Sequence, residues 1–317
     1  MNIIFDTNAS RKYVENILID NIDEYAKIKA KEFDDKHIKL LLTPVVLMEL
    51  QYHLVDIKDR DYSISFKTIK ALLLTNKFQT LTNNDCYLAA PEILIARDLF
   101  GLTIPGREDM YSSIMHSSRL ISEESNSYIP KLSLINGGTI KDYIDNIENG
   151  FAIQINGFLS QTLEKCSDLK QETISKFIQS KHTDFALTLY IVRTTYNLLI
   201  QENQLPKNYL NIAHPNDPNI QKIKKQCEFI ATRYPSFLSL FKELITRFFQ
   251  SQKQLTTKKM KNYIWDILLM FNVNNLTIQK EKVLFITDDK AMLLTAKTND
   301  EYSNILTYDE FKNSYLI

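Results

Sequence analysis

Strand signals in this chain of 317 residues are confined to its two ends, and this distribution constrains the fold more than any other feature. Residues 2–5 and 38–42 are short apolar runs of strand length, and each is followed by a helical pattern. Residues 283–286 and 305–306 repeat this alternation near the other end. Because strands that alternate with helices indicate a parallel sheet with crossover helices, we expect the two ends to form one α/β domain.

The middle of the chain shows helical periodicity with almost no strand signals. We therefore predict a first part of the α/β domain over residues 1–119, an all-α insertion over 120–256, and the second part of the α/β domain over 257–317. The insertion is expected to be a packed helical bundle that shapes a groove or an oligomer contact.

Composition excludes several common classes of site. Lysines and arginines number 38 and acids also 38, so a polyanionic partner would have to be bound by a local patch. The six glycines all lie between Gly101 and Gly157, so glycine-rich phosphate loops are absent. The cysteines and histidines form no C-x-x-C or H-E-x-x-H pattern, and the sequence contains no G-x-S-x-G motif. What remains is chemistry carried by carboxylates.

Targeting signals are also missing from the sequence. The apolar run over residues 2–5 is too short for a signal peptide, and no later run is long enough to span a bilayer. The three cysteines show no pairing pattern. We therefore expect a cytoplasmic protein that makes no membrane contact.

Acidic residues follow the predicted strands at the points where ligands collect in a parallel sheet. Asp6 directly follows the first strand, Glu49 lies in the second helical turn after the second strand, and Asp288 and Asp289 follow the late strand. Asp266 lies in an apolar helix that leads back into that late strand. Clustered carboxylates repel one another, and a hard divalent cation relieves this repulsion, so Mg²⁺ or Mn²⁺ is the expected occupant.

Each acid also has a simpler interpretation. Asp6 could cap the first helix, and Asp288 or Asp289 could cap the helix that follows the late strand. Glu49 could be a solvated position on a half-buried helix, and Asp266 could pair with a lysine such as Lys261. The joint placement of the acids at strand ends is more specific than any one of them.

Four segments together resemble the PIN-domain ribonuclease family: residues 1–8, residues 43–50, the helix around Asp266, and residues 283–289, which end in a T-x-D pattern. The closing residues 305–311 resemble the usual end of that family as well. The resemblance covers about the first 120 and the last 60 residues and implies a PIN-like parallel sheet flanked by helices. It also implies hydrolysis of RNA phosphodiesters that leaves 5′-phosphate and 3′-hydroxyl ends, and a role as a toxin or phage-defence nuclease.

By this resemblance the four catalytic acids, which are also the cation ligands, are Asp6, Glu49, Asp266 and Asp289. Asp288, at the variable position of the T-x-D pattern, is a further candidate cation ligand. The polar residues expected to support the site are Thr7, Asn8 and Thr287. In this role the cation neutralises the phosphate and lowers the pKa of an attacking water molecule.

The third acid is ambiguous at this stage. Residues 101–109 resemble the loop and helix start that present this acid in compact family members, so Asp109 competes with Asp266 as a metal ligand. Asp266 is preferred here because it lies in an apolar helix, whereas Glu108 and Asp109 are explained by favourable charge at a helix N-terminus.

We expect RNA to be bound by a lysine cluster near the end of the insertion, formed by Lys258, Lys259 and Lys261. The other partners that we expect are an inhibitory protein and a second copy of the chain. The alternative function is a non-catalytic PIN-like scaffold that binds RNA or a protein partner through its helical insertion.

Overall fold

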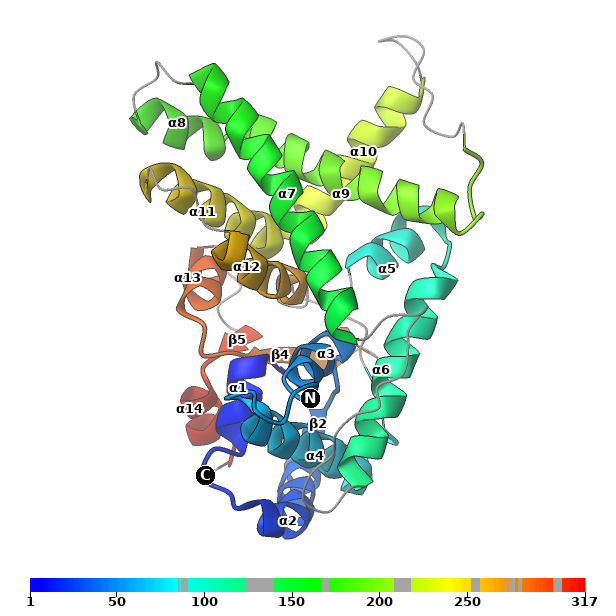
Figure 1. Cartoon of the computed structure of the whole chain (residues 1–317), viewed down its shortest axis with the longest axis vertical. Helices are drawn as coiled ribbons and strands as arrows, with labels where there is room; N and C mark the ends of the chain where they lie inside the picture. The colour runs from blue at the N-terminus through cyan, green and yellow to red at the C-terminus, as the bar shows by residue number, and fades with distance from the viewer. Residues whose placement is uncertain are drawn as a thin grey trace. The chain divides into compact units, whose positions relative to one another are not determined.

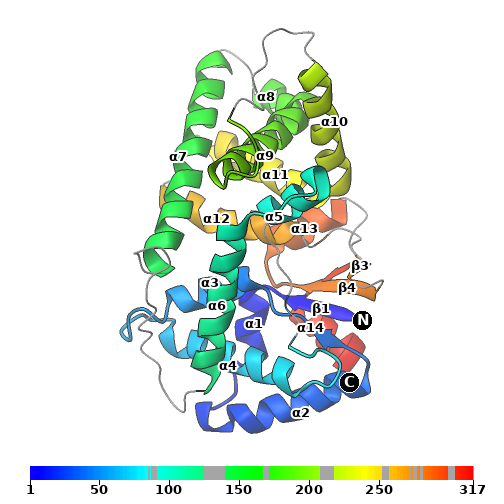
Figure 2. The same ribbon diagram turned by 90° about the vertical axis from the view of Figure 1, so that its right-hand side faces the viewer.

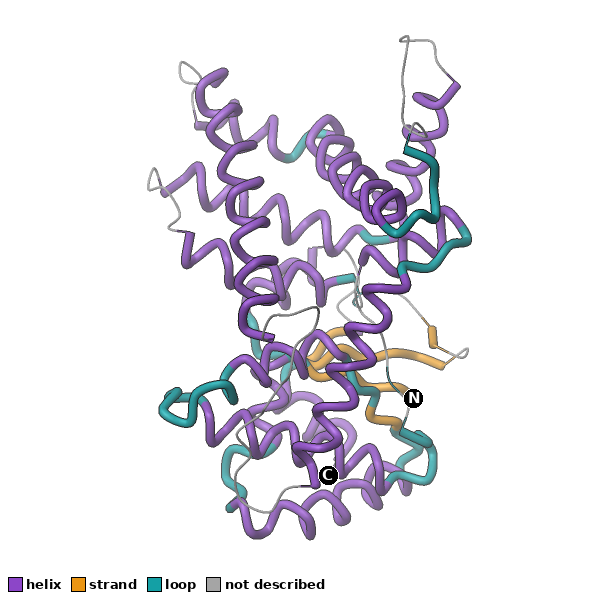
Figure 3. The backbone as a smooth tube through the Cα atoms, turned by 45° about the vertical axis from the view of Figure 1, so that its right-hand side comes forward, coloured by secondary structure: helices purple, strands orange, loops and turns teal. Residues whose placement is uncertain are grey.

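A computed structural model of the chain describes residues 1–84, 86, 91–123, 140–166, 171–207, 218–251, 257–271, 273, 277–278, 281–298 and 304–316 (Figure 1). It divides into two compact units. The sheet unit comprises Met1–Ala89, Asp109–Asn146 and Asn275–Ile317, and the helical unit comprises Ala90–Glu108 and Ile147–Asn274. The strands, orange in Figure 3, all belong to the sheet unit within the described residues.

The sheet is built from strands contributed by both ends of the chain, as the sequence predicts. β1 (Asn2–Phe5) lies between β2 (Lys39–Leu40) and β4 (Glu281–Ile286), and both of these pair with it in parallel. β5 (Ile305–Leu306) pairs in parallel with the end of β4, and β3 (Thr277–Ile278) pairs antiparallel with its start. Figure 2 shows β1 and β4 side by side. The predicted α/β class is confirmed.

The central strands pair because they are apolar on both faces. Ile3 and Ile4 of β1 and Leu284 and Phe285 of β4 are fully buried. Strands buried on both sides read as continuous apolar runs and occur in sheets covered by helices on both faces. In Figure 2, helices α2 (Ile22–Asp35) and α4 (Tyr62–Phe78) lie on one side of these strands and α13 (Lys290–Thr298) on the other.

The remaining helices of the sheet unit are short, apart from one. They are α1 (Thr7–Tyr13), α3 (Pro44–Tyr52), most of α6 (Pro105–Glu123), the start of α7 (Ile140–Cys166) and α14 (Tyr308–Phe311); a 3₁₀ turn (Ile19–Asn21) and a terminal π-helical turn (Lys312–Leu316) complete it. Thr307 and Glu310 form a capping box that opens α14, as their T-x-x-E spacing favours.

The helical pattern that follows the first strand is interrupted, because α1 ends at Tyr13 and α2 begins only at Ile22. Residues 78–81 form no strand: Phe78 ends α4, and a turn follows. Leu42, after β2, forms an isolated parallel bridge with Cys86.

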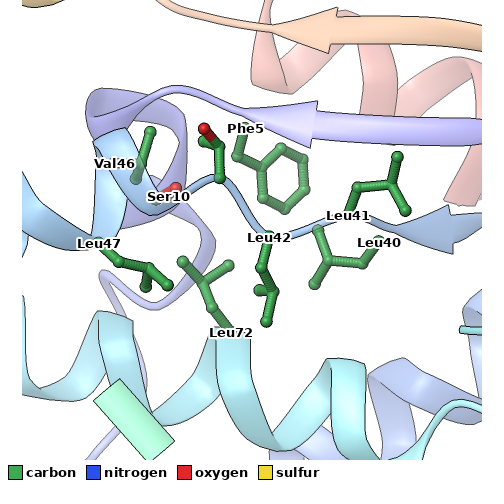
Figure 4. Close-up of a pocket in the computed structure, with 9 residues that line it drawn as sticks. Phe5, Ser10, Leu40, Leu41, Leu42, Val46, Leu47 and Leu72 are labelled. Atoms are coloured by element: carbon green, nitrogen blue, oxygen red, sulfur yellow. The ribbon is translucent and has the colours of Figure 1, made fainter. Parts of the chain in front are cut away.

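Apolar packing fixes the start of α3 beneath the sheet edge. Figure 4 shows Phe5 of β1, Leu42 after β2, and Val46 and Leu47 of α3 around a small cavity of about 10 Å³, with Leu72 of α4 below. All five side chains are buried. This packing fixes the start of α3, the helix that carries Glu49, against β1 and α4.

The helical unit contains only helices within the described residues. Its elements are α5 (Pro91–Ile95), a π-helical turn (Ala96–Phe100), the first turn of α6, the rest of α7, α8 (Gln171–Ile178), α9 (Lys181–Gln201), α10 (Pro218–Arg233), α11 (Pro235–Ser251) and α12 (Thr257–Met270). Gly101, with φ of 65°, ends the π-helical turn in the left-handed conformation. Ala96, Ile104 and Leu199 form a small buried cluster behind this turn.

The unit boundaries differ from the expected segments 1–119, 120–256 and 257–317. Residues 90–108 and 257–274 belong to the helical unit, whereas residues 120–146 belong to the sheet unit. Helical periodicity does not reveal these boundaries, because α6 and α7 continue without a break from one unit into the other. Among the described helices, none is long and apolar enough to cross a membrane.

Candidate functional site

Strand register brings Asp6 next to Thr287. Phe5 and Ile286 are partners in the parallel ladder, so the residues that follow them leave the sheet at the same level. The backbone N–H of Asp6 donates to the carbonyl of Ile286 at 2.9 Å, which continues the ladder by one residue. Asp6 and Thr287 thus lie together at the carboxyl ends of the two central strands, where parallel sheets bind ligands.

The Asp6 carboxylate is buried and oriented by two donors. Only 3% of Asp6 is exposed. Its Oδ1 accepts the N–H of Ala9 at 2.6 Å, so Asp6 caps α1, and its Oδ2 accepts the hydroxyl of Thr287. The capping interpretation of Asp6 is therefore realised, but each oxygen retains a lone pair that a cation could use.

Burial raises the pKa of Asp6 from 3.8 to about 7, against the lowering effect of its two hydrogen bonds, and the charges of Glu49 and Asp288 raise it further. With a pKa near 7 this carboxyl group is only partly ionised at neutral pH, and a nearby positive charge would favour its ionised form. The environment of Asp6 is therefore suited to a cation.

Glu49 extends the acid cluster from α3. It is half-buried, and its Oε2 accepts the hydroxyl of Thr7, the first residue of α1. Because Thr7 directly follows Asp6 in the chain, this bond ties the Glu49 carboxylate to the start of α1. Asn8, the other residue expected to support the site, is exposed.

Asp288 and Asp289 have different environments. The Oδ1 of Asp289 accepts the N–H of Met292 at 2.8 Å, so Asp289 caps α13, and its own N–H donates to the hydroxyl of Thr287 at 3.0 Å. Its Oδ2 accepts no hydrogen bond from the described residues. Asp288 instead accepts the N–H of Tyr308 at 3.3 Å and pairs with Lys12 at 3.5 Å.

The two competing third acids fall in different units. Asp109 is exposed on α6 and belongs to the sheet unit, together with Asp6 and Glu49. Asp266 is half-buried on α12 of the helical unit, beside the buried Trp265. The structure thus brings Asp6, Glu49 and the Asp288–Asp289 pair together within one unit, and Asp266 is not part of that unit.

Gln51 links the helix of Glu49 to the helix of Asp109. It is fully buried, and its Nε2 donates to the carbonyl of Ile114 at 2.9 Å and to the hydroxyl of Ser118 at 2.5 Å. Its Oε1 accepts the hydroxyl of Ser117 at 3.0 Å. These bonds hold α3 and α6 in one relative position.

Gln51→Met should lower the free energy of unfolding by about 1–3 kcal/mol, because it keeps the side-chain length but leaves buried polar groups of α6 without a partner. Urea unfolding followed by circular dichroism measures the change. Ser117→Ala, which removes only the half-buried bond, should cost less. Equal costs for the two variants would contradict a central role for Gln51.

Sequence reasoning missed a second group of potential ligands, in the loop after α3. His53, Asp59 and Asp61 each offer a ligand atom, and these atoms lie within 4.8 Å of one another. Asp59 accepts the N–H of Asp61 at 2.8 Å, and its oxygens lie 3.1 Å from His53 Nδ1. Partial burial acts to raise the pKa of Asp59, but these contacts together hold that pKa below its usual value. Asp61 is paired with Arg11 and Arg60. The spacing H-x₅-D-x-D was the available signal.

The lysines expected to bind RNA, Lys258, Lys259 and Lys261, lie on α12. Their side chains are outside the described part of the structure. The same holds for any pairing of Lys261 with Asp266. These expectations therefore remain predictions.

The oxygens around Asp6 fit a hard divalent cation. Carboxylates are the ligands that Mg²⁺ and Mn²⁺ prefer, and Asp6, Glu49 and Asp289 each offer carboxylate oxygens. Threonine hydroxyls orient two of these carboxylates, as outer partners commonly do around metal ions. Comparison of the chain with family models, curated proteins and solved structures finds no match to any of them.

Proposed function

We propose that this protein is a metal-dependent endoribonuclease with a PIN-like sheet domain. The observation that carries the proposal is the buried Asp6 carboxylate at the end of the central strand, close enough to Glu49 and Asp288 for their charges to raise its pKa. Keeping such acids ionised is costly for folding, and a cation that binds the folded protein offsets the cost.

The residues that would hold the cation are Asp6, Glu49 and Asp289, together with the third acid, which is Asp109 or Asp266. When bound, a divalent cation neutralises a phosphodiester and activates a water molecule for attack. The contribution of the chain is orientation: Thr287 and the Ala9 N–H direct Asp6, and Thr7 directs Glu49. Ligands fixed before the substrate arrives need no reorganisation during the reaction.

RNA, rather than another phosphodiester, is proposed from the family resemblance of residues 1–8, 43–50 and 283–289. From the same source come the proposals of a cytoplasmic toxin or phage-defence nuclease, an inhibitory protein partner and self-association.

The proposal is tested by incubating the purified chain with end-labelled tRNA, mRNA and single-stranded DNA. Each substrate is incubated in Mg²⁺, in Mn²⁺ and in excess EDTA. We expect cleavage of RNA that requires the metal and leaves 5′-phosphate ends. Cleavage in EDTA would overturn the cation mechanism. RNA binding without cleavage under all metal conditions would favour the non-catalytic scaffold, and cleavage of DNA alone would favour a DNA nuclease.

Changing Lys258, Lys259 and Lys261 together to glutamine should weaken RNA binding and flatten its salt dependence. If all three contact phosphates of a single strand, the slope of log affinity against log salt should fall by about 2. The matched control is the triple glutamine variant of Lys222, Lys224 and Lys225 on α10, which removes the same charge elsewhere in the helical unit. Equal slopes for the two variants would assign the effect to net charge alone.

A further inference from the structure

Lys12 is a positively charged side chain beside the acid cluster, and the proposed mechanism gives it no role. It lies on α1, six residues after Asp6, and is partly exposed. Its Nζ is 2.8 Å from Asp309 Oδ2 and 3.5 Å from Asp288 Oδ2. It also lies 5.9 Å from the centre of the Tyr308 ring. Lys12 therefore joins α1 to the residue after Thr287 and to the start of α14.

The Asp288 carboxylate is held from two sides, and both partners are in the sheet unit. One oxygen faces the Lys12 ammonium, and the other accepts the backbone N–H of Tyr308, the first residue of α14. A carboxylate at a helix N-terminus is further stabilised by the backbone N–H groups there. The side chain of Asp288 is 28% exposed, so its ion pair with Lys12 is partly shielded from solvent.

We propose that Lys12 is a positioning residue that holds Asp288 as a charge partner, outside the set of cation ligands, and so limits the negative charge of the acid cluster. This inference rests on the proposed function. Asp289 is left as the ligand at this strand end, because its Oδ2 accepts no hydrogen bond from the described residues. The two adjacent aspartates thus have different tasks.

Titration of the metal alone tests the inference. Mn²⁺ affinity is measured by isothermal calorimetry on the full chain. Lys12→Met should tighten Mn²⁺ binding about two- to fivefold, because it removes a positive charge next to the acid cluster. The effect should be modest because the Lys12 side chain is partly exposed to solvent. Asp288→Asn should weaken binding by a similar factor, and the double variant should return to the wild-type affinity because the net charge is restored. Lys12→Arg should keep the wild-type affinity.

Two matched controls separate this effect from a general change of charge. Lys31→Met removes the same charge from an exposed position on α2, in the same unit, and should leave Mn²⁺ affinity unchanged. Asp309→Asn removes the other partner of Lys12 and keeps its pair with Asp288. It should also bind Mn²⁺ with wild-type affinity.

Three results would overturn the inference. Unchanged affinity in Lys12→Met would assign Lys12 to an ordinary surface pair, and a raised KM for RNA alone would assign it to substrate binding. A loss of about a hundredfold in Asp288→Asn that the double variant does not restore would make Asp288 a direct ligand. Asp6→Asn is titrated in the same series: wild-type Mn²⁺ affinity in this variant would overturn the proposed function itself, whatever Lys12 does.

Discussion

Asp6→Asn is expected to abolish RNA cleavage while leaving the fold intact. The amide keeps the shape of the carboxylate, its oxygen can still accept the Ala9 N–H, and its NH₂ group can donate to the hydroxyl oxygen of Thr287. What it removes is the charge that a divalent cation requires. Cleavage assays in Mg²⁺ and Mn²⁺, with thermal unfolding of both proteins, measure the two effects.

The same variant should change the dependence of stability on pH. In the folded wild-type protein the pKa of Asp6 is raised from 3.8 to about 7, so between these values the folded state binds more protons than the unfolded state. Metal-free wild type should therefore lose stability as pH rises from about 4 to 7, by roughly 4 kcal/mol at most. Asp6→Asn should lack this loss and melt at a higher temperature than wild type at pH 8.

Added metal should act in the opposite direction. Mn²⁺ should raise the melting temperature of the wild type at pH 8 more than at pH 5.5, because the cation binds the ionised carboxylate. It should not raise that of Asp6→Asn. Glu15→Gln, which makes the same acid-to-amide change at an exposed position in the turn after α1, serves as the control and should retain both cleavage and the shift. Full cleavage by Asp6→Asn would refute the assignment of Asp6.

Asp109→Asn is expected to lose cleavage by a factor of about 100 or more, and Asp266→Asn to retain most of it. We now favour Asp109 over Asp266, the acid preferred from the sequence, because Asp109 shares the sheet unit with Asp6 and Glu49. Asp109 also lies on α6, which Gln51 holds against the helix of Glu49. Asp266 lies half-buried in the helical unit.

The measurement combines single-turnover cleavage with Mn²⁺ titration of both variants. Asp109→Asn should weaken metal binding as well as cleavage, and its stability should change by less than about 1 kcal/mol, because an exposed charge near a helix start contributes little to folding. Loss of both properties in Asp266→Asn alone would restore Asp266 as the third acid. Loss in neither variant would favour the scaffold function.

Local signals were enough to predict several elements. The apolar runs that became β1 and β4 were recognisable because strands buried on both faces contain few polar residues. The capping box at Thr307 and Glu310 was recognisable because its two hydrogen bonds join residues three apart. Gly101 ends its helical turn in the left-handed conformation that glycine adopts without strain, which is the role that a glycine at the end of a helical pattern favours.

The acids were identified one at a time by the same local reasoning. Asp6 and Asp289 stand at helix starts, so both the capping and the ligand interpretations could be stated from the sequence. The structure shows that both residues cap helices, and that the hydroxyl of Thr287 joins them by donating to Asp6 and accepting the N–H of Asp289. Neither interpretation excludes the other, because a carboxylate has more lone pairs than one cap uses.

Local patterns were sufficient to predict that the two ends of the chain form the sheet, that its middle is helical, and that acids follow the strands. The register of Phe5 with Ile286, the pairing of Lys12 with Asp288, and the inclusion of residues 90–108 in the helical unit are known only from the fold. Strand and cap signals depend on neighbouring residues, and they can therefore be recognised in a sequence. Register, ion pairing and unit boundaries depend on contacts between residues far apart in the chain, such as Lys12 and Asp309, which are separated by 297 positions.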